Sequence, residues 1–136
     1  MKVIICLDER RGILFNHRRQ SKDRRVIADI VSHLDGRSLY ITPYSEKLFL
    51  ESGISYTVDE RMLEIAEAED VCFAESADFL AHLDSVTQIT VYWWNRHYPS
   101  DVRVDLDFDE AGYALKEQYE FEGFSHEKIT VQRYER

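Results

Sequence analysis

Apolar residues along this chain fall first into short continuous runs and later into alternation with polar residues. Continuous runs rich in β-branched residues are typical of strands buried on both faces, as in a parallel sheet. Such runs predict strands over residues 2–7, 38–42, 71–74 and 87–94. A period of two predicts strands with one solvent-exposed face, and it covers residues 102–108, 113–121 and 129–134.

Helical spacing separates the early runs. Its clearest example extends from Val26 to Leu34, with Ser21 as a suitable N-cap and Gly36 as a suitable C-terminal stop. Shorter helices are predicted over residues 45–53, 59–66 and 77–83. Helices that connect early strands imply parallel pairing. We therefore expect an α/β fold, with a mainly parallel twisted sheet flanked by helices and closed by an antiparallel C-terminal hairpin.

Length and composition favour one globular domain over residues 1–136. The chain has 136 residues, 44% of them apolar, which is enough for an ordinary core. No apolar run approaches the roughly 20 residues of a membrane span, and the first run is too short for a signal peptide, so we expect a cytoplasmic protein. Cys6 and Cys72 lie inside apolar runs and are expected to be free, buried thiols.

Charge is distributed unevenly along the chain. Residues 9–25 carry seven Arg and Lys against two acidic residues, a local charge of +5 within a protein of net charge −9. A positive segment on an acidic body favours a phosphate or a nucleic-acid backbone as partner, although the body would repel DNA in general. The alternative is that these cations pair with acidic side chains of their own domain. Residues 12–20, within this segment, are expected to form a loop.

The order of several short segments is distinctive. They are Gly12-Ile13 after the first strand, Asp23 at the first helix, Leu39–Ser45, Val71–Ala74 with Glu75-Ser76, the strand ending at Trp94, Asp101, and Thr130–Tyr134. This order resembles the dihydrofolate reductase family over almost the whole chain. The resemblance implies that family's fold, with residues 12–20 matching its mobile active-site loop and Asp23 its single buried acidic residue.

The departures from the family pattern fall on the cofactor site. Glu75-Ser76 stands where the resemblance expects a glycine pair, and Pro43-Tyr44 where it expects Gly-Arg. A dinucleotide diphosphate needs close backbone approach, which glycine permits and a carboxylate opposes by size and charge. We therefore expect no nicotinamide cofactor, and no other cofactor is implied.

Candidate site residues lie where strands of an open α/β sheet end. Asp23 is the catalytic candidate, and its alternative role is to complement the dipole of the first helix. The ligand-binding candidates would suit a planar or anionic ligand, because they include an aromatic ring for stacking, two amides and two cations. They are Asn16, Arg19, Trp94, Asn95 and Arg96. The alternative for the strand end is that Tyr92 and Trp93 face opposite core layers while Arg96 is solvated.

Two other chemistries find little support. The histidines lack metal-ligand spacing, so no metal site is expected. Ser125-His126-Glu127 contains a nucleophile and a base, but neighbours on a strand point to opposite faces. These residues are therefore expected to begin the last strand rather than to form a triad.

Three functional hypotheses remain open. The first is a non-reductase binding protein on a dihydrofolate reductase-like scaffold, with a small planar or phosphorylated ligand or a protein partner. The second is a divergent nicotinamide-dependent reductase of a pterin-like substrate that relies on Asp23. The third is a nucleotide or RNA-binding protein that uses the arginine-rich segment, because guanidinium groups and aromatic rings stack on unpaired bases.

Overall fold

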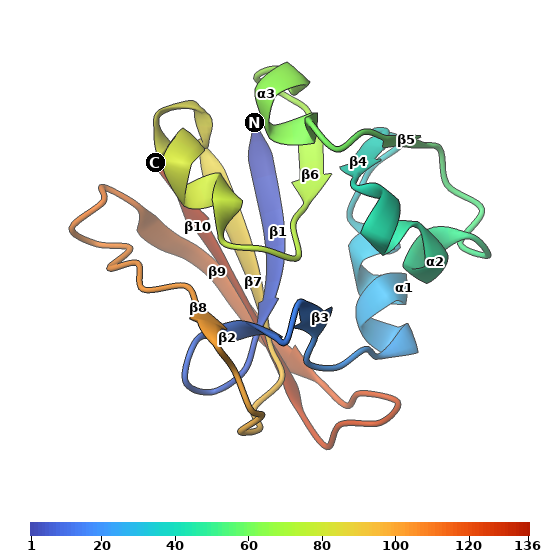
Figure 1. Ribbon diagram of the computed structural model, residues 1–136, viewed down its shortest axis with the longest axis vertical. Coiled ribbons are helices and arrows are strands. Elements are labelled where there is room, and N and C mark those ends of the chain that lie inside the picture. The colour runs from blue at the N-terminus through green and yellow to red at the C-terminus, as the bar shows by residue number, and fades with distance from the viewer.

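A seven-stranded sheet organises the chain, whose computed structural model describes all of residues 1–136 (Figure 1). Its order is β5-β4-β6-β1-β7-β10-β9. The central strand β1 (Lys2–Leu7) pairs in parallel with β6 (Val71–Phe73) and β7 (Gln88–Trp93). The parallel part continues through β4 (Leu39–Ile41) to β5 (Tyr56–Val58) at one edge. The predicted parallel strands are thus confirmed, and the continuous apolar run of β1 occupies the most enclosed position.

The C-terminal hairpin closes the other edge of the sheet. β10 (Ile129–Glu135) is antiparallel to both β7 and β9 (Ala114–Phe121), and its register shifts between Arg133 and Tyr134. The long edge strand β9 is exposed over its first five residues and half-buried only at Tyr119 and Phe121. The α/β class with an antiparallel hairpin is confirmed.

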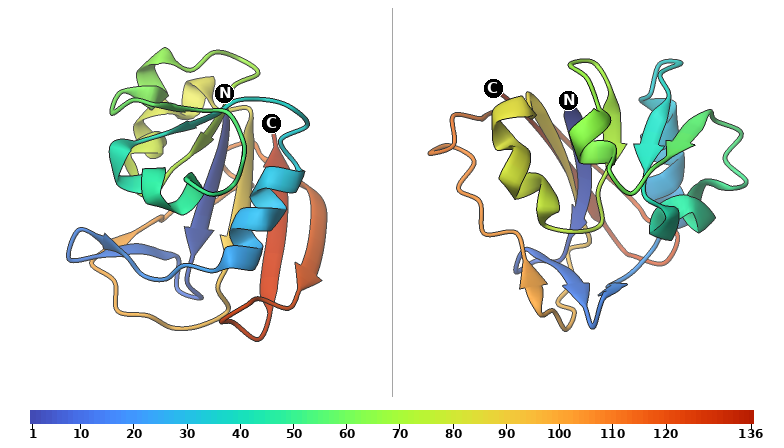
Figure 2. Two further views of the ribbon diagram at one scale, coloured as in Figure 1. Left: turned by 90° about the vertical axis from the view of Figure 1, so that its right-hand side faces the viewer. Right: turned by 45° about the horizontal axis from the view of Figure 1, so that its top comes forward.

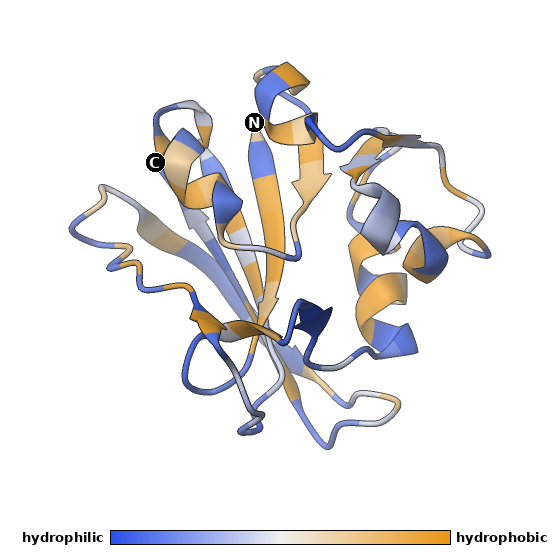
Figure 3. Cartoon of the chain, in the orientation of Figure 1, coloured by the Kyte–Doolittle hydropathy of each residue, from blue (hydrophilic) through white to orange (hydrophobic).

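Two core layers cover the two faces of the sheet. Side chains alternate along β1, so that Val3, Ile5 and Leu7 enter one layer and Ile4 the other. The Ile4 layer is covered by α1 (Arg24–Ser32) and α2 (Glu46–Phe49), and the opposite layer by the 3₁₀ helix η2 (Asp78–Ser85). Figure 2 shows α1 lying against the sheet, and Figure 3 shows the apolar residues concentrated along β1 and α1.

Short elements complete the connections. The 3₁₀ turn η1 (Pro43–Ser45) leads into α2, and α3 (Met62–Ile65) precedes β6. Tyr92 and Trp93 enter opposite core layers, as one sequence alternative proposed. None of the helices is both long enough and apolar enough to cross a lipid bilayer.

The expected loop at residues 12–20 is instead a small hairpin, which corrects the sequence interpretation. β2 (Gly12–Phe15) pairs with β3 (Arg18–Arg19) and with β8 (Val102–Arg103) in a second sheet. Asn16 and His17, which join β2 to β3, both have positive φ values, 52° and 62°. Two successive residues with positive φ form the tight turn whose twist matches paired strands, and asparagine favours it.

The alternation over residues 102–108 predicted a strand, and most of this segment is not one. Only Val102–Arg103 forms a ladder, while Val104, Leu106 and Phe108 are buried without strand pairing. A period of two therefore marks which side chains point inward, and it does not establish that the backbone finds a partner. The predicted helix over residues 77–83 is the 3₁₀ helix η2.

Candidate functional site

Asp23 begins α1 as its N-cap, a role that the sequence had suggested for Ser21. Its backbone is extended, with φ −153° and ψ 125°, and its side chain accepts a hydrogen bond from the Arg25 N–H. The carboxylate also accepts the backbone N–H groups of Phe124 and Ser125, both at 2.9 Å. Asp23 therefore joins the start of α1 to the loop between β9 and β10.

This junction explains a glycine in the hairpin loop. A Cβ at Gly123 would lie 2.8 Å from the Asp23 carboxylate and 2.8 Å from the His126 carbonyl oxygen. Separations this short exclude a side chain, so glycine lets the loop close onto Asp23.

The loop between β9 and β10 also brings the side chain of His126 into contact with Asp23. Its Nδ1 lies 2.8 Å from Asp23 Oδ2, and both side chains are almost wholly buried. Burial alone would raise the pKa of Asp23, but hydrogen bonds from Phe124 and His126, with those of the neighbouring amides, outweigh burial and hold this pKa well below its usual range. The ionised carboxylate can only accept hydrogen bonds, so His126 Nδ1 carries a proton.

The other imidazole nitrogen faces two hydroxyl groups. His126 Nε2 lies 2.9 Å from the Tyr98 hydroxyl and 3.1 Å from Ser21 Oγ, and Tyr98 donates to Ser21 at 3.4 Å. Trp94 stacks on the imidazole with ring centroids 4.6 Å apart. We call these five residues, Ser21, Asp23, Trp94, Tyr98 and His126, the histidine cluster.

A second polar group borders the same small cavity as the histidine cluster. Arg19 on β3 donates from Nε and Nη2 to the two carboxylate oxygens of Glu75, at 2.7 and 2.9 Å. Ser45 Oγ donates to the same carboxylate at 2.7 Å, and the guanidinium lies 4.4 Å from the centre of the Tyr44 ring. We call Arg19, Tyr44, Ser45 and Glu75 the arginine clamp.

The clamp and the cluster leave little room between them. The cavity that both border has a volume of about 20 Å³, which is space for about one water molecule. Gln20 also borders it, and its buried Oε1 has no hydrogen-bond partner within the protein. The inner cleft is thus closed to a ring-sized ligand in this structure.

An open groove adjoins the closed cavity. It lies between α1 and α2, has a volume of about 540 Å³, and shares Ile27 and Leu48 with the inner cavity. Its wall contains the cations Arg24 and Lys47 and the acid Glu51. The Arg24 guanidinium lies 4.0 Å from the centre of the exposed Phe124 ring.

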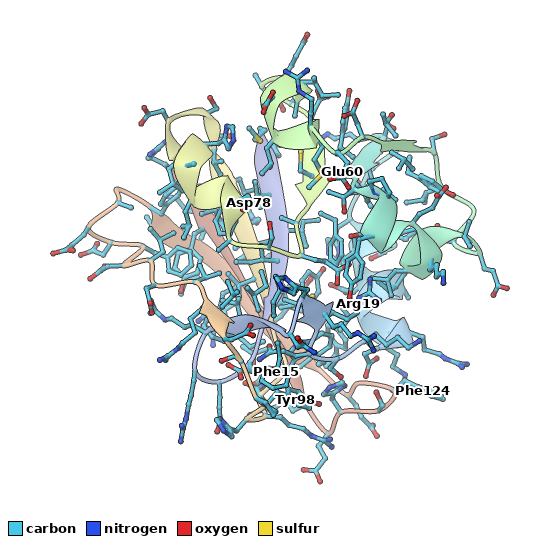
Figure 4. The ribbon with its side chains drawn as sticks, in the orientation of Figure 1. Phe15, Arg19, Glu60, Asp78, Tyr98 and Phe124 are labelled. Atoms are coloured by element: carbon cyan, nitrogen blue, oxygen red, sulfur yellow. The ribbon has the colours of Figure 1, made fainter.

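The predicted site residues separate into two groups. Arg19, Asp23 and Trp94 border the inner cavity, whereas Asn16, Asn95 and Arg96 do not. The Asn16 N–H donates to Asp101, and the Asn95 amide donates to Lys128 and Thr130, which ties the end of β7 to β10. Arg96 is exposed. Figure 4 places Arg19, Phe15, Tyr98 and Phe124 at the end of the molecule where β1 finishes.

Sequence reasoning missed the association of His126, Ser21 and Tyr98. His126 lies in the hairpin loop and not in β10, which corrects its expected place at the start of the last strand. The sequence did contain a signal for the loop. Gly123 precedes several polar residues, a pattern typical of a turn before a strand, and it could have placed His126 outside β10. The local pattern could not indicate which distant side chain His126 would meet.

No family model matches the sequence, and no curated protein matches it. Among solved structures, dihydrofolate reductase from Enterococcus faecalis, in complex with NADP(H) and RAB-propyl, superimposes with a TM-score of 0.69. The match covers 99% of this chain and 95% of that chain at 8% sequence identity. The fold is that of dihydrofolate reductase. At so low an identity the likeness concerns the fold alone.

The side chains present do not fit the dinucleotide of a dihydrofolate reductase. A second cleft, of about 240 Å³, is bordered by Tyr44 and Glu75 of the clamp and by the carboxylates of Glu60 and Asp78. Figure 4 labels Glu60 and Asp78. The Ser76 hydroxyl accepts the Asp78 N–H, and the Tyr44 carbonyl accepts a hydrogen bond from Arg19. Glu60 and Asp78 have no ion-pair partner and oppose a diphosphate by charge, Glu75 takes up the space of a glycine, and the expected glycines and arginine are missing.

Proposed function

We propose that this protein is a non-reductase binding protein that holds a small, planar, phosphorylated ligand in the groove between α1 and α2. The observation that carries the proposal is the contrast between the filled inner cleft, about 20 Å³, and the open groove, about 540 Å³. A groove of that size lies within the range of small-molecule sites.

The lining of the groove determines the kind of ligand. Ile27, Val31 and Leu48 offer an apolar surface for a flat ring, and Arg24 and Lys47 offer charge for a phosphate. Arg19 and Trp94, expected from the sequence to bind the ligand, do not line the groove but border the inner cavity, which shares Ile27 and Leu48 with it. Asp23 contributes indirectly by fixing the start of α1.

A binding assay with defined probes tests this proposal. AMP, GMP and flavin mononucleotide would be titrated by calorimetry, each beside its unphosphorylated counterpart. We expect at least one phosphate to bind, its counterpart to bind more weakly, and Arg24→Ala and Lys47→Ala each to weaken binding by about tenfold. Lys116→Ala, on the exposed edge strand β9, is the control and should leave binding unchanged. Absence of binding by all three phosphates, or binding that is insensitive to Arg24 and Lys47, would contradict the proposal.

RNA binding is the second candidate, and a specific observation favours it. Of the seven basic residues between positions 9 and 25, only Arg19 forms an ion pair with a carboxylate. Arg11 and Arg25 donate to backbone carbonyl groups instead. The exposed rings of Phe15 and Phe124 lie at the same end of the molecule, and such rings can stack on unpaired bases (Figure 4).

Fluorescence polarisation with a labelled oligouridine distinguishes the two candidates. RNA binding predicts an affinity that falls steeply with salt and that weakens in Arg18→Ala. Lys47→Ala, which lies in the groove, should leave oligouridine affinity unchanged while it impairs phosphate-ligand binding. No salt-dependent binding at micromolar protein would remove the RNA candidate.

A further inference from the structure

The histidine cluster has the connectivity of a nucleophile, a base and a carboxylate. Asp23 Oδ2 lies 2.8 Å from His126 Nδ1, and His126 Nε2 lies 3.1 Å from Ser21 Oγ. Such an arrangement is recognised by geometry, and its residues occur in any order along unrelated chains. We propose that Ser21 is a nucleophile activated by His126, and that the cluster is a site of acyl transfer from short-chain esters.

The tautomer of His126 suits it to act as a base. Because ionised Asp23 accepts the proton on Nδ1, neutral His126 leaves a lone pair on Nε2, directed toward the two hydroxyl groups. Trp94 stacks on one face of the ring and fixes its plane. Asp23 touches no substrate and is a positioning residue, and Ser21 and His126 are the catalytic pair.

Access and charge stabilisation are both available at Ser21. Ser21 is partly exposed in the segment between β3 and α1, unlike His126 and Asp23. The backbone N–H of Lys22, the next residue, donates no hydrogen bond within the protein. The Tyr98 hydroxyl lies 2.9 Å from His126 Nε2 and 3.4 Å from Ser21 Oγ, and when Ser21 donates to Nε2 the Tyr98 proton is released to donate to a substrate oxygen. These are the kinds of donor that stabilise an oxyanion.

The reaction balances with water as the only co-reactant. Ser21 Oγ attacks the ester carbonyl carbon, and its proton passes to His126 Nε2. The C–O bond to the alcohol then breaks, and the alcohol leaves with that proton. Water attacks the acyl-serine, gives a proton to Nε2, and releases the carboxylic acid as Ser21 recovers its proton.

The space behind Ser21 limits the acyl group. The inner cavity, about 20 Å³, holds roughly one water-sized group. An acetyl methyl fits that volume, and a longer chain does not. The inference does not depend on ligand binding in the groove between α1 and α2, because Ser21, Asp23 and His126 do not border that groove.

Covalent labelling tests the proposal directly. Methanesulfonyl fluoride, whose methyl group fits the small cavity, should add once to the protein, with the adduct mapped to Ser21 by peptide mass spectrometry. Ser21→Ala should lose the adduct and reduce hydrolysis of p-nitrophenyl acetate to the level of buffer, and Ser55→Ala, at an exposed serine away from the cluster, should retain both. Absence of an adduct on the folded wild-type protein, or an adduct that persists in Ser21→Ala, would overturn the proposal.

Two further variants separate catalysis from folding. In Ser21→Cys, the thiol next to His126 should react with iodoacetamide at neutral pH at least about tenfold faster than the thiol of Ser55→Cys. Equal rates would count against activation by His126. Asp23→Asn should slow labelling at least about a hundredfold and move its pH profile to lower pH, because the imidazolium loses its carboxylate. An unchanged pH profile would show that Asp23 has no positioning role.

Discussion

The guanidinium of Arg19 and the carboxylate of Glu75 meet in a two-point ion pair that closes the inner cleft. The pair joins β3 to the segment after β6, with side-chain exposures of 22% and 11%. Attraction between partly buried charges is screened less by water than that between exposed charges. The contact therefore holds together two segments that both border the cavity.

A double-mutant cycle measures this ion pair. Arg19→Ala and Glu75→Ala should each lower the free energy of unfolding in urea, with a coupling energy of about 1–2 kcal/mol. The matched control is the pair Arg61 and Glu64, whose side chains are 74% and 52% exposed, and it should show no measurable coupling. Equal coupling energies for the two ion pairs would show that the Arg19–Glu75 pair stabilises the protein no more than an exposed pair does.

The two cysteines report whether the cleft opens. Burial, and then the charge of Glu75, raise the pKa of the Cys6 thiol far above its usual value, and burial raises the pKa of Cys72 to about 11. Native protein should therefore react with Ellman's reagent at neither position, and both thiols should react in guanidinium chloride. Of the two thiols expected to be buried, Cys72 is buried and Cys6 is only half-buried, so Arg19→Ala should expose Cys6, which borders the cavity, and leave Cys72 unreactive. Labelling of Cys72 alone would contradict this assignment.

Acid stability tests the environment of Asp23. Its folded pKa lies below the unfolded value of about 3.9, so its contribution to stability is complete above that value and is lost as pH falls through the folded pKa. Asp23→Asn should lower the free energy of unfolding by about 2–4 kcal/mol at neutral pH, since the amide cannot accept all the N–H groups.

The pH dependence distinguishes charge from general damage. Between about pH 5 and pH 2, the free energy of unfolding should fall less steeply in Asp23→Asn than in the wild type. Asp8, whose pKa is also lowered, remains in both proteins and supplies the residual slope. Parallel curves would show that ionised Asp23 does not stabilise the fold.

Cofactor binding provides a test of the altered dihydrofolate reductase-like cleft. Calorimetric titration with NADPH should detect no binding at micromolar concentration, because Glu75 and Ser76 stand where glycines are expected and the cleft beside them also carries the unpaired carboxylates of Glu60 and Asp78. The variant Glu75→Gly with Ser76→Gly should raise any residual affinity. Micromolar binding to the wild-type protein would support the reductase hypothesis.

The sheet could be predicted because its signals are local. The apolar run of β1 indicates a strand buried on both faces, and the apolar–polar alternation in the sequences of β9 and β10 indicates strands buried on one face. Both patterns can be recognised from consecutive residues alone. The β2–β3 hairpin was missed although Asn16-His17 carries a turn signal. Its strands are too short, four and two residues, to show a period.

The candidate site was harder to predict because its contacts are distant. Asp23 was identified as a candidate from its position in the chain, but the choice between Ser21 and Asp23 as N-cap depends on where the hairpin loop lies. His126 could be assigned to a loop or a strand only once β10 was known to begin at Ile129. Residues that meet over such separations leave no periodic pattern.

The Asp23–His126 contact has a consequence for the order of events during synthesis. The two residues are 103 positions apart, so a ribosome adding roughly 5–20 residues per second makes Asp23 about 5–20 seconds before His126. During that interval the emerging helix α1 lacks the hairpin loop that supplies most donors to its N-cap. Substitutions in residues 123–126 should therefore lower the yield of folded protein from the nascent chain, in addition to altering the finished site.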